Sequence, residues 1–481
     1  MPAHVNFFAA DPLSLTSVSV QTPYLAKQGV GTPFALITYV HKGGEIMKKM
    51  TKAIIGVSAL GGAYGLYRAG RHMFGEECTA VPEIHGFVRN GFEPVRDAFE
   101  ENFRSRRELG GAVSVYHKGE KVVDLWGGLR DPATRDPWRE DTMTVVYSAT
   151  KGLSALALAL AHSRGLLDYD APVSNYWPEF AMNGKEDVTV RQLLAHQAGL
   201  FAFDEPVDVA TVADLDRLAR VMERQRPAWE PGTRQGYHAI SLGFYENELM
   251  RRADPENRTL GRFFDEEIAK PLKLEFYIRL PEEIPNERLA PMESPSILKR
   301  IMGFPLRMTL ESMQPSSNIY RALIANPGAG IVHDDEAVFA RELEVPSGGG
   351  VGTARAIAKA YAIFASGGFD LGLRPETLHE LESPPKPPTH GWYDECMLGE
   401  AKFSLGFMRP CEAWPFDVPE AYGHPGAGGA MGFADPVNQI GYGYITNRMG
   451  VSLSGDPREL ALRKALYSCI PQETRVMAAA G

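Results

Sequence analysis

Residues suited to nucleophilic chemistry lie together in the stretch Ser148-Ala149-Thr150-Lys151. The stretch follows a β-rich run at 141–147 and precedes an apolar, helical run at 152–162. In the first turn of a helix, side chains three positions apart are neighbours, about 5–6 Å apart at Cβ. A serine hydroxyl is a weak nucleophile until an adjacent base accepts its proton. The spacing therefore suits a nucleophile–base pair formed by Ser148 and Lys151.

A second interpretation of Ser148 is a helix N-cap, where serine is common. Lys151 argues against a capping role alone, because a capping box has Glu or Gln at that position. A cation there also opposes the positive end of the helix dipole. Burial near that end would lower the pKa of the lysine, which suits a base. On these residues alone, the catalytic and the capping interpretations both stay open.

Two further segments carry residues of the same kind of site. The segment 229–239 places Tyr237 after a Pro-Gly turn and before an apolar helical run, and the segment 423–436 is rich in glycine, which lets a backbone approach a ligand closely. With these segments the chain resembles the serine β-lactamase and penicillin-binding-protein superfamily, and among its members the class C β-lactamase-like esterases. The resemblance extends over residues 86–471.

The resemblance implies a role for each motif residue. Ser148 corresponds to the acylated nucleophile, Lys151 to its proton partner, and Tyr237 to the tyrosine that shares the base function and later protonates the leaving group. His424 stands where the family has Lys or His, facing Tyr237 across the cleft. Gly426 and Ala427 follow on the same strand end, and the backbone N–H groups of Ser148 and Ala427 would form the oxyanion hole that stabilises developing negative charge.

Two departures from the family pattern bear on the substrate. The tyrosine motif of class C β-lactamases ends in Asn, and this chain has Ala239 there. The third motif begins with His424 in place of Lys, so a fixed positive charge for a substrate carboxylate is weaker near neutral pH. Both changes favour an ester, a peptide-like amide or another acyl substrate over a β-lactam.

The resemblance implies an α+β fold of the β-lactamase/transpeptidase type, with an antiparallel sheet flanked by helices plus an all-helical subdomain. Three parts are expected along the chain: an N-terminal leader at 1–84, a β-lactamase-like catalytic domain at 85–471 and a C-terminal tail at 472–481. The leader contains an uncharged, glycine-containing run at 53–67, which is shorter than the roughly 20 residues of a membrane span. A signal segment, a weak membrane anchor, an organellar targeting segment and a helix packed on the domain are all open for it, and so is a start at Met47.

Hydrophobic periodicity gives a coarse map of the domain. A hairpin is expected at 111–117 and 121–126, strands at 403–408, 430–434 and 441–447, and loops with short helices at 281–346. Helices are expected at 84–107, 151–164, 189–196, 212–226, 240–252, 353–366 and 456–469.

Composition excludes several classes of function. The formal net charge of −10 disfavours nucleic-acid binding, which needs a basic face. The twelve histidines and four cysteines form no motif with zinc-ligand spacing, so no metal is predicted, and the implied mechanism needs no cofactor. The expected partner is a small-molecule or peptide-like acyl substrate, with membrane association through 53–67 as an open alternative. Compartment and oligomeric state are not fixed by these residues.

These features favour a serine hydrolase that cleaves an ester or amide through a Ser148 acyl-enzyme. The alternative is a structural, filament-forming β-lactamase-like protein with little or no catalysis, in which the N-terminal segment would matter more than the cleft. A penicillin-binding or D-peptidase role is disfavoured by Ala239 and His424.

Overall fold

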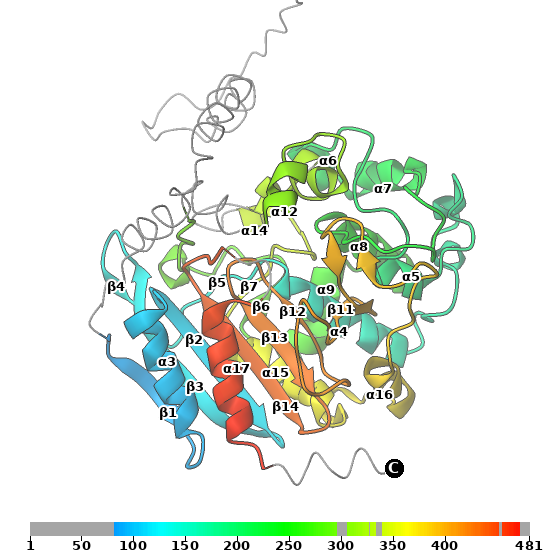
Figure 1. Cartoon of the computed structure of the whole chain (residues 1–481). Coiled ribbons are helices and arrows are strands. Elements are labelled where there is room, and N and C mark those ends of the chain that lie inside the picture. Colours follow the sequence, from blue (N-terminus) through cyan, green and yellow to red (C-terminus); the bar gives the residue numbers. More distant parts are fainter. Residues whose placement is uncertain (1–80, 296–304, 327, 333–338, 452–454, 472–481) are drawn as a thin grey trace, which may run out of the picture. The chain divides into compact units, whose positions relative to one another are not determined.

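A nine-stranded antiparallel sheet joins the N-terminal and C-terminal parts of the chain (Figure 1). The computed structural model describes residues 81–295, 305–326, 328–332, 339–451 and 455–471. The strand order is β1-β3-β2-β14-β13-β12-β11-β10, with β4 paired to β3. The strands are β1 (Ile84–Val88), β2 (Gly110–His117), β3 (Glu120–Asp131), β4 (Asp136–Pro137), β10 (Phe403–Ser404), β11 (Phe407–Met408), β12 (Tyr422–Pro425), β13 (Met431–Asp435) and β14 (Ile440–Thr446). Because β2 pairs with β14, the two ends of the domain meet in the middle of the sheet.

Helices cover both faces of this sheet. On one face, α3 (Glu93–Ser105) packs beside α17 (Pro457–Ser468) (Figure 1). On the other face, α15 (Ala354–Ala365) contacts β2, β13 and β14, and α4 (Ala149–Ser163) contacts β11, β12 and β13. Every residue of α4 except His162 is buried, as expected for a helix that is apolar all round. The motif of Ser148 and Lys151 therefore begins the central helix of the domain.

The part of the chain between α4 and α15 is mainly helical and lies beside the sheet (Figure 1). Two of its short strands, β6 and β7, form a small sheet with β5, which precedes α4, in the order β5-β7-β6. Its helical segments are η1 (Val173–Asn175), η2 (Pro178–Ala181), α5 (Val190–Leu194), α6 (Val209–Ala213), α7 (Leu215–Arg224), α8 (Ser241–Ala253), α9 (Leu260–Phe264), η3 (Asp265–Ala269), α10 (Lys270–Leu272), η4 (Asn286–Arg288), α12 (Leu306–Glu311), α13 (Asn318–Tyr320), η5 (Arg321–Ala325), η6 (Ala329–Val332) and α14 (Phe339–Glu342). The remaining elements are β5 (Thr144–Val145), β6 (Phe276–Tyr277), β7 (Val351–Gly352), η7 (Phe369–Leu371), α16 (Pro375–Glu382), β8 (Tyr393–Asp394) and β9 (Gly399–Glu400). The predicted α+β class is confirmed.

Two predicted elements differ from the structure. The predicted helix at 84–107 is wrong in its first part, because Ile84–Val88 is strand β1, paired along its length with β3. A short apolar run does not distinguish a helix from a strand by period alone, and pairing with a neighbouring strand decides. The predicted strand at 403–408 is two short strands, β10 and β11, joined by a turn in which Leu405 and Gly406 both have positive φ.

Some predictions fall on residues that the structure does not describe. The run at 53–67, most of the predicted leader and the tail at 472–481 lie outside the described residues. The domain boundaries at 84 and 471 therefore stay predictions. Within the described ranges, no helix combines the length and the apolar character needed to cross a membrane.

Candidate active site

Ser148 lies at the first turn of α4 with its hydroxyl directed at two other motif residues. Its backbone is helical, with φ −62° and ψ −11°, and its side chain makes no capping hydrogen bond. Instead, Ser148 Oγ accepts a hydrogen bond from Tyr237 OH at 2.9 Å, and Lys151 Nζ lies 3.4 Å away. Ser148 therefore stands at the N-cap position of α4, but its side chain caps no backbone N–H and instead joins the predicted side-chain cluster.

Lys151 is buried beneath the serine, and no carboxylate among the described residues forms an ion pair with it. Its Nζ donates hydrogen bonds to the carbonyl oxygens of Ala239 at 2.6 Å and Ser347 at 2.7 Å. Burial lowers the pKa of Lys151 to about 7, against the opposing effect of the Glu246 carboxylate. A neutral amine has two N–H groups, and both donate to these carbonyls. Its lone pair then points toward Ser148 Oγ and can accept the serine proton. The arrangement suits a base acting near neutral pH.

Tyr237 is held from behind by a buried carboxyl and two rings. Its backbone N–H donates to Asp394 Oδ1 at 3.1 Å, and the same oxygen also accepts the backbone N–H groups of Cys396 and Met397. The Tyr237 ring stacks on Phe403, with centroids 5.5 Å apart, and contacts His196 edge-on. Burial raises the pKa of Tyr237, so the phenol stays protonated as a donor to Ser148.

His424, on β12, lies across from Tyr237 as predicted. The two rings are stacked with centroids 6.0 Å apart, and His424 Nδ1 is 2.7 Å from the carbonyl oxygen of Pro425. Burial, with a further effect of Lys151, lowers the pKa of His424 to about 3. The imidazole is therefore neutral at physiological pH and supplies no charge for a substrate carboxylate.

The two backbone N–H groups expected to form the oxyanion hole are those of Ser148 and Ala427. Neither donates a hydrogen bond to any residue that the structure describes. Gly426 brings the second segment close, because a Cβ there would lie 2.1 Å from the Val146 carbonyl oxygen, two residues before the serine. Gly426 itself does not line the cavity, whereas Ala427 does.

Ser148, Tyr237, His424 and Ala427 open into a cavity of about 390 Å³. Its wall is mainly apolar and includes Ile240, Met308, Leu323, Val332, Met397, Phe403 and Met408. Among the described lining residues, Glu400 is the one charged side chain at neutral pH. No group of three His, Cys, Asp or Glu side chains in the described ranges could hold a metal ion.

Sequence reasoning missed several residues that shape this site. Asp394 lies in a short strand with no periodic signal, and the carbonyl of Ser347 follows an irregular segment. The run of three glycines after Ser347 was the available signal of a close backbone approach. Glu246, on α8, is fully buried, and neither carboxyl oxygen has a hydrogen-bond partner among the described residues. His196 and His238 act as buried hydrogen-bonding groups, since His196 Nδ1 accepts the His238 backbone N–H at 3.0 Å.

Comparison with known proteins gives matches that span this whole site. The family model described as Beta-lactamase matches residues 95–466. Esterase/beta-lactamase LipL of Mycobacterium tuberculosis is 33% identical over 387 residues, covering 79% of this chain and 84% of that protein. A solved family VIII carboxylesterase is similar with a TM-score of 0.71 and 37% identity, covering 81% of this chain and 100% of its own. A penicillin-binding protein homologue from Caulobacter crescentus has a TM-score of 0.68 and 32% identity, over 81% and 100% of the two chains. This chain therefore belongs to the Beta-lactamase family, and it is a serine hydrolase.

Proposed function

We propose that this protein hydrolyses uncharged esters of apolar acids through an acyl-enzyme on Ser148. The observation that carries the proposal is the contact of Ser148 Oγ with both Tyr237 OH and Lys151 Nζ at the mouth of an apolar cavity. A nucleophile within reach of a base, with that base oriented by further groups, is the general arrangement for covalent catalysis.

In the acylation step, Ser148 Oγ attacks the ester carbonyl carbon while its proton passes to the neutral amine of Lys151. The carbonyl oxygen gains negative charge and accepts the N–H groups of Ser148 and Ala427, which are preorganised for it. Tyr237, kept protonated by its raised pKa, gives its proton to the departing alcohol. The proton on Lys151 then passes to the Tyr237 phenolate and restores the phenol, since Lys151 Nζ lies 4.9 Å from the centroid of the tyrosine ring.

In the second step, water attacks the acyl-enzyme carbonyl and gives its proton to the same base system. The bond to Ser148 Oγ breaks, the serine recovers a proton, and the acid leaves. The sum is ester plus water giving acid plus alcohol.

The cavity supports uncharged substrates in particular. His424 is neutral and Ala239 provides no side-chain amide, so neither residue holds a substrate carboxylate. Met308, Met397 and Met408 are flexible apolar side chains that adapt to varied apolar groups. An ester with an apolar acyl chain fits this wall better than a carboxylate-bearing β-lactam.

The test uses p-nitrophenyl acetate, butyrate and octanoate, a chromogenic cephalosporin and a fluorophosphonate probe. Wild type is compared with Ser148→Ala and with Ser154→Ala, a buried serine of the same helix whose hydroxyl donates to the Pro346 carbonyl at 2.8 Å. We expect labelling and ester turnover in wild type and in Ser154→Ala, and a loss of about 10³-fold or more in Ser148→Ala. The kcat/KM for butyrate should exceed that for the cephalosporin.

Equal turnover by wild type and Ser148→Ala would contradict the catalytic proposal and would favour the structural, filament-forming alternative. Turnover of the cephalosporin above every ester would contradict the substrate class while leaving the serine mechanism in place.

A further inference from the structure

The backbone that carries the Ala427 N–H is a tight turn, Gly426–Gly429, called here the oxyanion turn. Gly429 N–H donates to the Gly426 carbonyl at 3.1 Å, and Gly426 N–H donates to the Ala430 carbonyl at 2.7 Å. Gly428, at the third position of the turn, has φ +92°, a value that favours glycine. Because three of its four residues are glycine, the turn has little stiffness of its own. Contacts from outside must therefore fix where the Ala427 N–H points.

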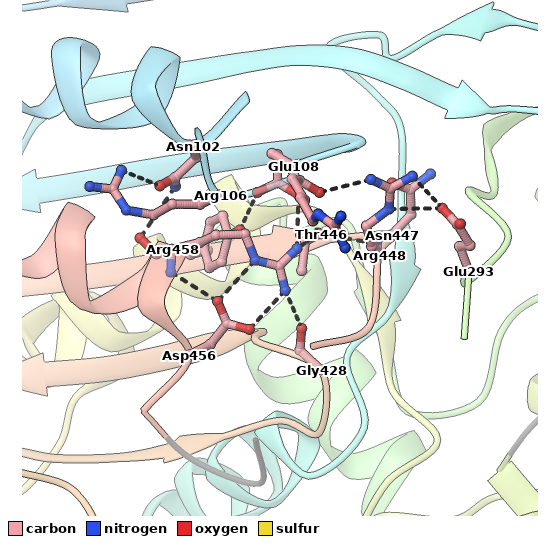
Figure 2. Close-up of polar contacts among 12 residues, drawn as sticks. Asn102, Arg106, Glu108, Glu293, Gly428, Thr446, Asn447, Arg448, Asp456 and Arg458 are labelled. Atoms are coloured by element: carbon pink, nitrogen blue, oxygen red, sulfur yellow. Dashed lines mark hydrogen bonds and ion pairs between the residues drawn. The ribbon is translucent and has the colours of Figure 1, made fainter. Parts of the chain in front are cut away.

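One such contact comes from the opposite side of the turn. The carbonyl oxygen of Gly428 accepts a hydrogen bond from Arg458 Nη2 at 2.8 Å (Figure 2). It also accepts one from the Gly450 backbone N–H at 3.0 Å. Arg458 belongs to the first turn of α17, on the far face of the sheet from α4. The turn is thus held between Val146, next to the nucleophile, and the guanidinium of Arg458.

The guanidinium is itself fixed at every donor. Nε and Nη2 donate to the two carboxylate oxygens of Asp456 at 2.9 and 2.8 Å. Nη1 donates to Glu108 Oε1 and Thr446 Oγ1, both at 3.1 Å (Figure 2). Together with the Gly428 contact, these bonds use all five N–H groups that an arginine offers. The remaining freedom of the side chain is therefore small.

Glu108 is in turn held by two residues of β14. It accepts hydrogen bonds from Thr446 Oγ1 at 2.6 Å and from the hydroxyl of Tyr444. The side chains of Arg458 and Glu108 are 5% and 0% exposed, so water does not weaken these bonds. A rigid, dry chain of contacts thus runs from β14 through Glu108 and Arg458 to the oxyanion turn.

We propose that Arg458 is a positioning residue that holds the oxyanion turn in register with Ser148, with Glu108 and Asp456 fixing the guanidinium. The inference rests on the proposed function, because it assigns the Ala427 N–H to the oxyanion hole. Ion pairing with two carboxylates needs only a cation at this place. The additional hydrogen bond to the Gly428 carbonyl needs a group that reaches the carboxylates and the turn at the same time. The planar guanidinium of arginine does so, and the single ammonium of lysine does not.

The test compares Arg458→Lys with Arg463→Lys in the full-length protein. Arg463 is a matched control: it lies on the same helix, is equally buried and pairs with Glu459, but it donates to Pro415 and not to the oxyanion turn. Steady-state constants for p-nitrophenyl butyrate are expressed per site titrated with fluorophosphonate, which removes any misfolded fraction. Inhibition by phenylboronic acid is measured in parallel, since its tetrahedral adduct with a serine places an oxygen where the oxyanion lies.

For Arg458→Lys we expect kcat to fall about 10- to 100-fold relative to wild type, while KM stays within about threefold. The Ki of phenylboronic acid should rise by the same factor by which kcat/KM falls. Arg463→Lys should change all three values by less than about threefold. Equal kinetics of the two variants at equal Tm would overturn the inference and leave the proposed function intact.

If Arg458→Lys does not fold, Glu108→Gln provides the same test with a smaller expected loss of kcat. Wild-type values of kcat and of the phenylboronic acid Ki in Glu108→Gln would overturn the inference. Wild-type protein without Ser148-dependent turnover would overturn both the inference and the proposed function.

Discussion

Two clusters of buried charge lie on either side of the oxyanion turn, and they are built in opposite ways. Around Arg458, the guanidinium finds a partner for each N–H group, and Asp456 and Glu108 are hydrogen-bonded. Beneath Ser148, Lys151 meets only neutral oxygens, and the carboxyl of Glu246 has no hydrogen-bond partner in the described ranges. Burial is nearly complete in both places.

The difference shows in the preferred protonation states. Burial would lower the pKa of Arg458, yet Tyr444, Glu108 and Asp456 raise it well above its ordinary value. Burial lowers the pKa of Lys151 to about 7 and raises that of Glu246 to about 8. The attraction between the two groups opposes both shifts but only in part. Paired charges stay charged and fix geometry, whereas unpaired ones approach neutrality and become available for proton transfer.

The largest expected difference between the two clusters appears when each cation, Lys151 or Arg458, is replaced by methionine. Lys151→Met should lower kcat/KM by about 10³- to 10⁴-fold, because the base is lost, while the free energy of unfolding stays equal or rises. Arg458→Met should lower that free energy by about 3–5 kcal/mol, because Asp456 and Glu108 remain buried without a cation. Steady-state kinetics and urea unfolding of both variants measure this contrast.

If both variants lost the same stability, the electrostatic distinction between the clusters would be wrong. Retention of more than a tenth of wild-type kcat/KM by Lys151→Met would remove the lysine from the mechanism.

The next prediction concerns pH. Since the base must be neutral, kcat/KM should rise about tenfold per pH unit below about 7 and level off above it. The lowered pKa of Lys151 also costs stability, and this cost shrinks between pH 7 and 10.5, where the unfolded chain binds the extra proton. The free energy of unfolding of wild type should therefore rise relative to that of Lys151→Met as pH increases through this window. A pH–rate profile and urea unfolding at pH 6.5 and 9.5 measure both effects. A flat profile between pH 5 and 8 would contradict the assigned base.

The smallest expected effect is at Glu246. Glu246→Met should raise the free energy of unfolding by about 1–3 kcal/mol at pH 8, because it removes an unsatisfied buried carboxyl. The folded state holds the carboxyl proton up to about pH 8, so wild type loses stability as pH rises from about 4.5 to about 8, and the variant should not. Urea unfolding at pH 5 and 8 tests this, with Glu248→Met, a carboxylate of the same helix paired with Arg251 and Arg252, as the destabilised control.

The local part of the site could be predicted from the sequence, because a serine and a lysine three positions apart must share a face of the helix that follows. Tyr237 and His424 came from the resemblance to a family. The contacts that tune these groups could not be predicted. Asp394 meets Tyr237 across 157 positions, and Glu108 meets Arg458 across 350. Periodicity reports which face of an element is apolar and says nothing of which distant element lies against it.

The same limit explains the error at the N-terminal edge of the sheet. Ile84–Val88 becomes a strand because β3 offers it a free edge. The hairpin of β2 and β3 and the central helix were predictable, since each is a run of consecutive residues long enough to show its period. The antiparallel sheet as a whole came from the resemblance to a family.

The pairing of Glu108 with Arg458 joins a residue that is synthesised early to one that is synthesised late. A ribosome makes Glu108 and the nucleophile early and α17 among the last described elements, and β14 must add to β2 before the two charges can meet. A growing or clipped chain thus displays Ser148 without a held oxyanion turn. If Arg458 positions that turn as proposed, full hydrolytic activity depends on α17 as well as on the motif residues that are made long before it.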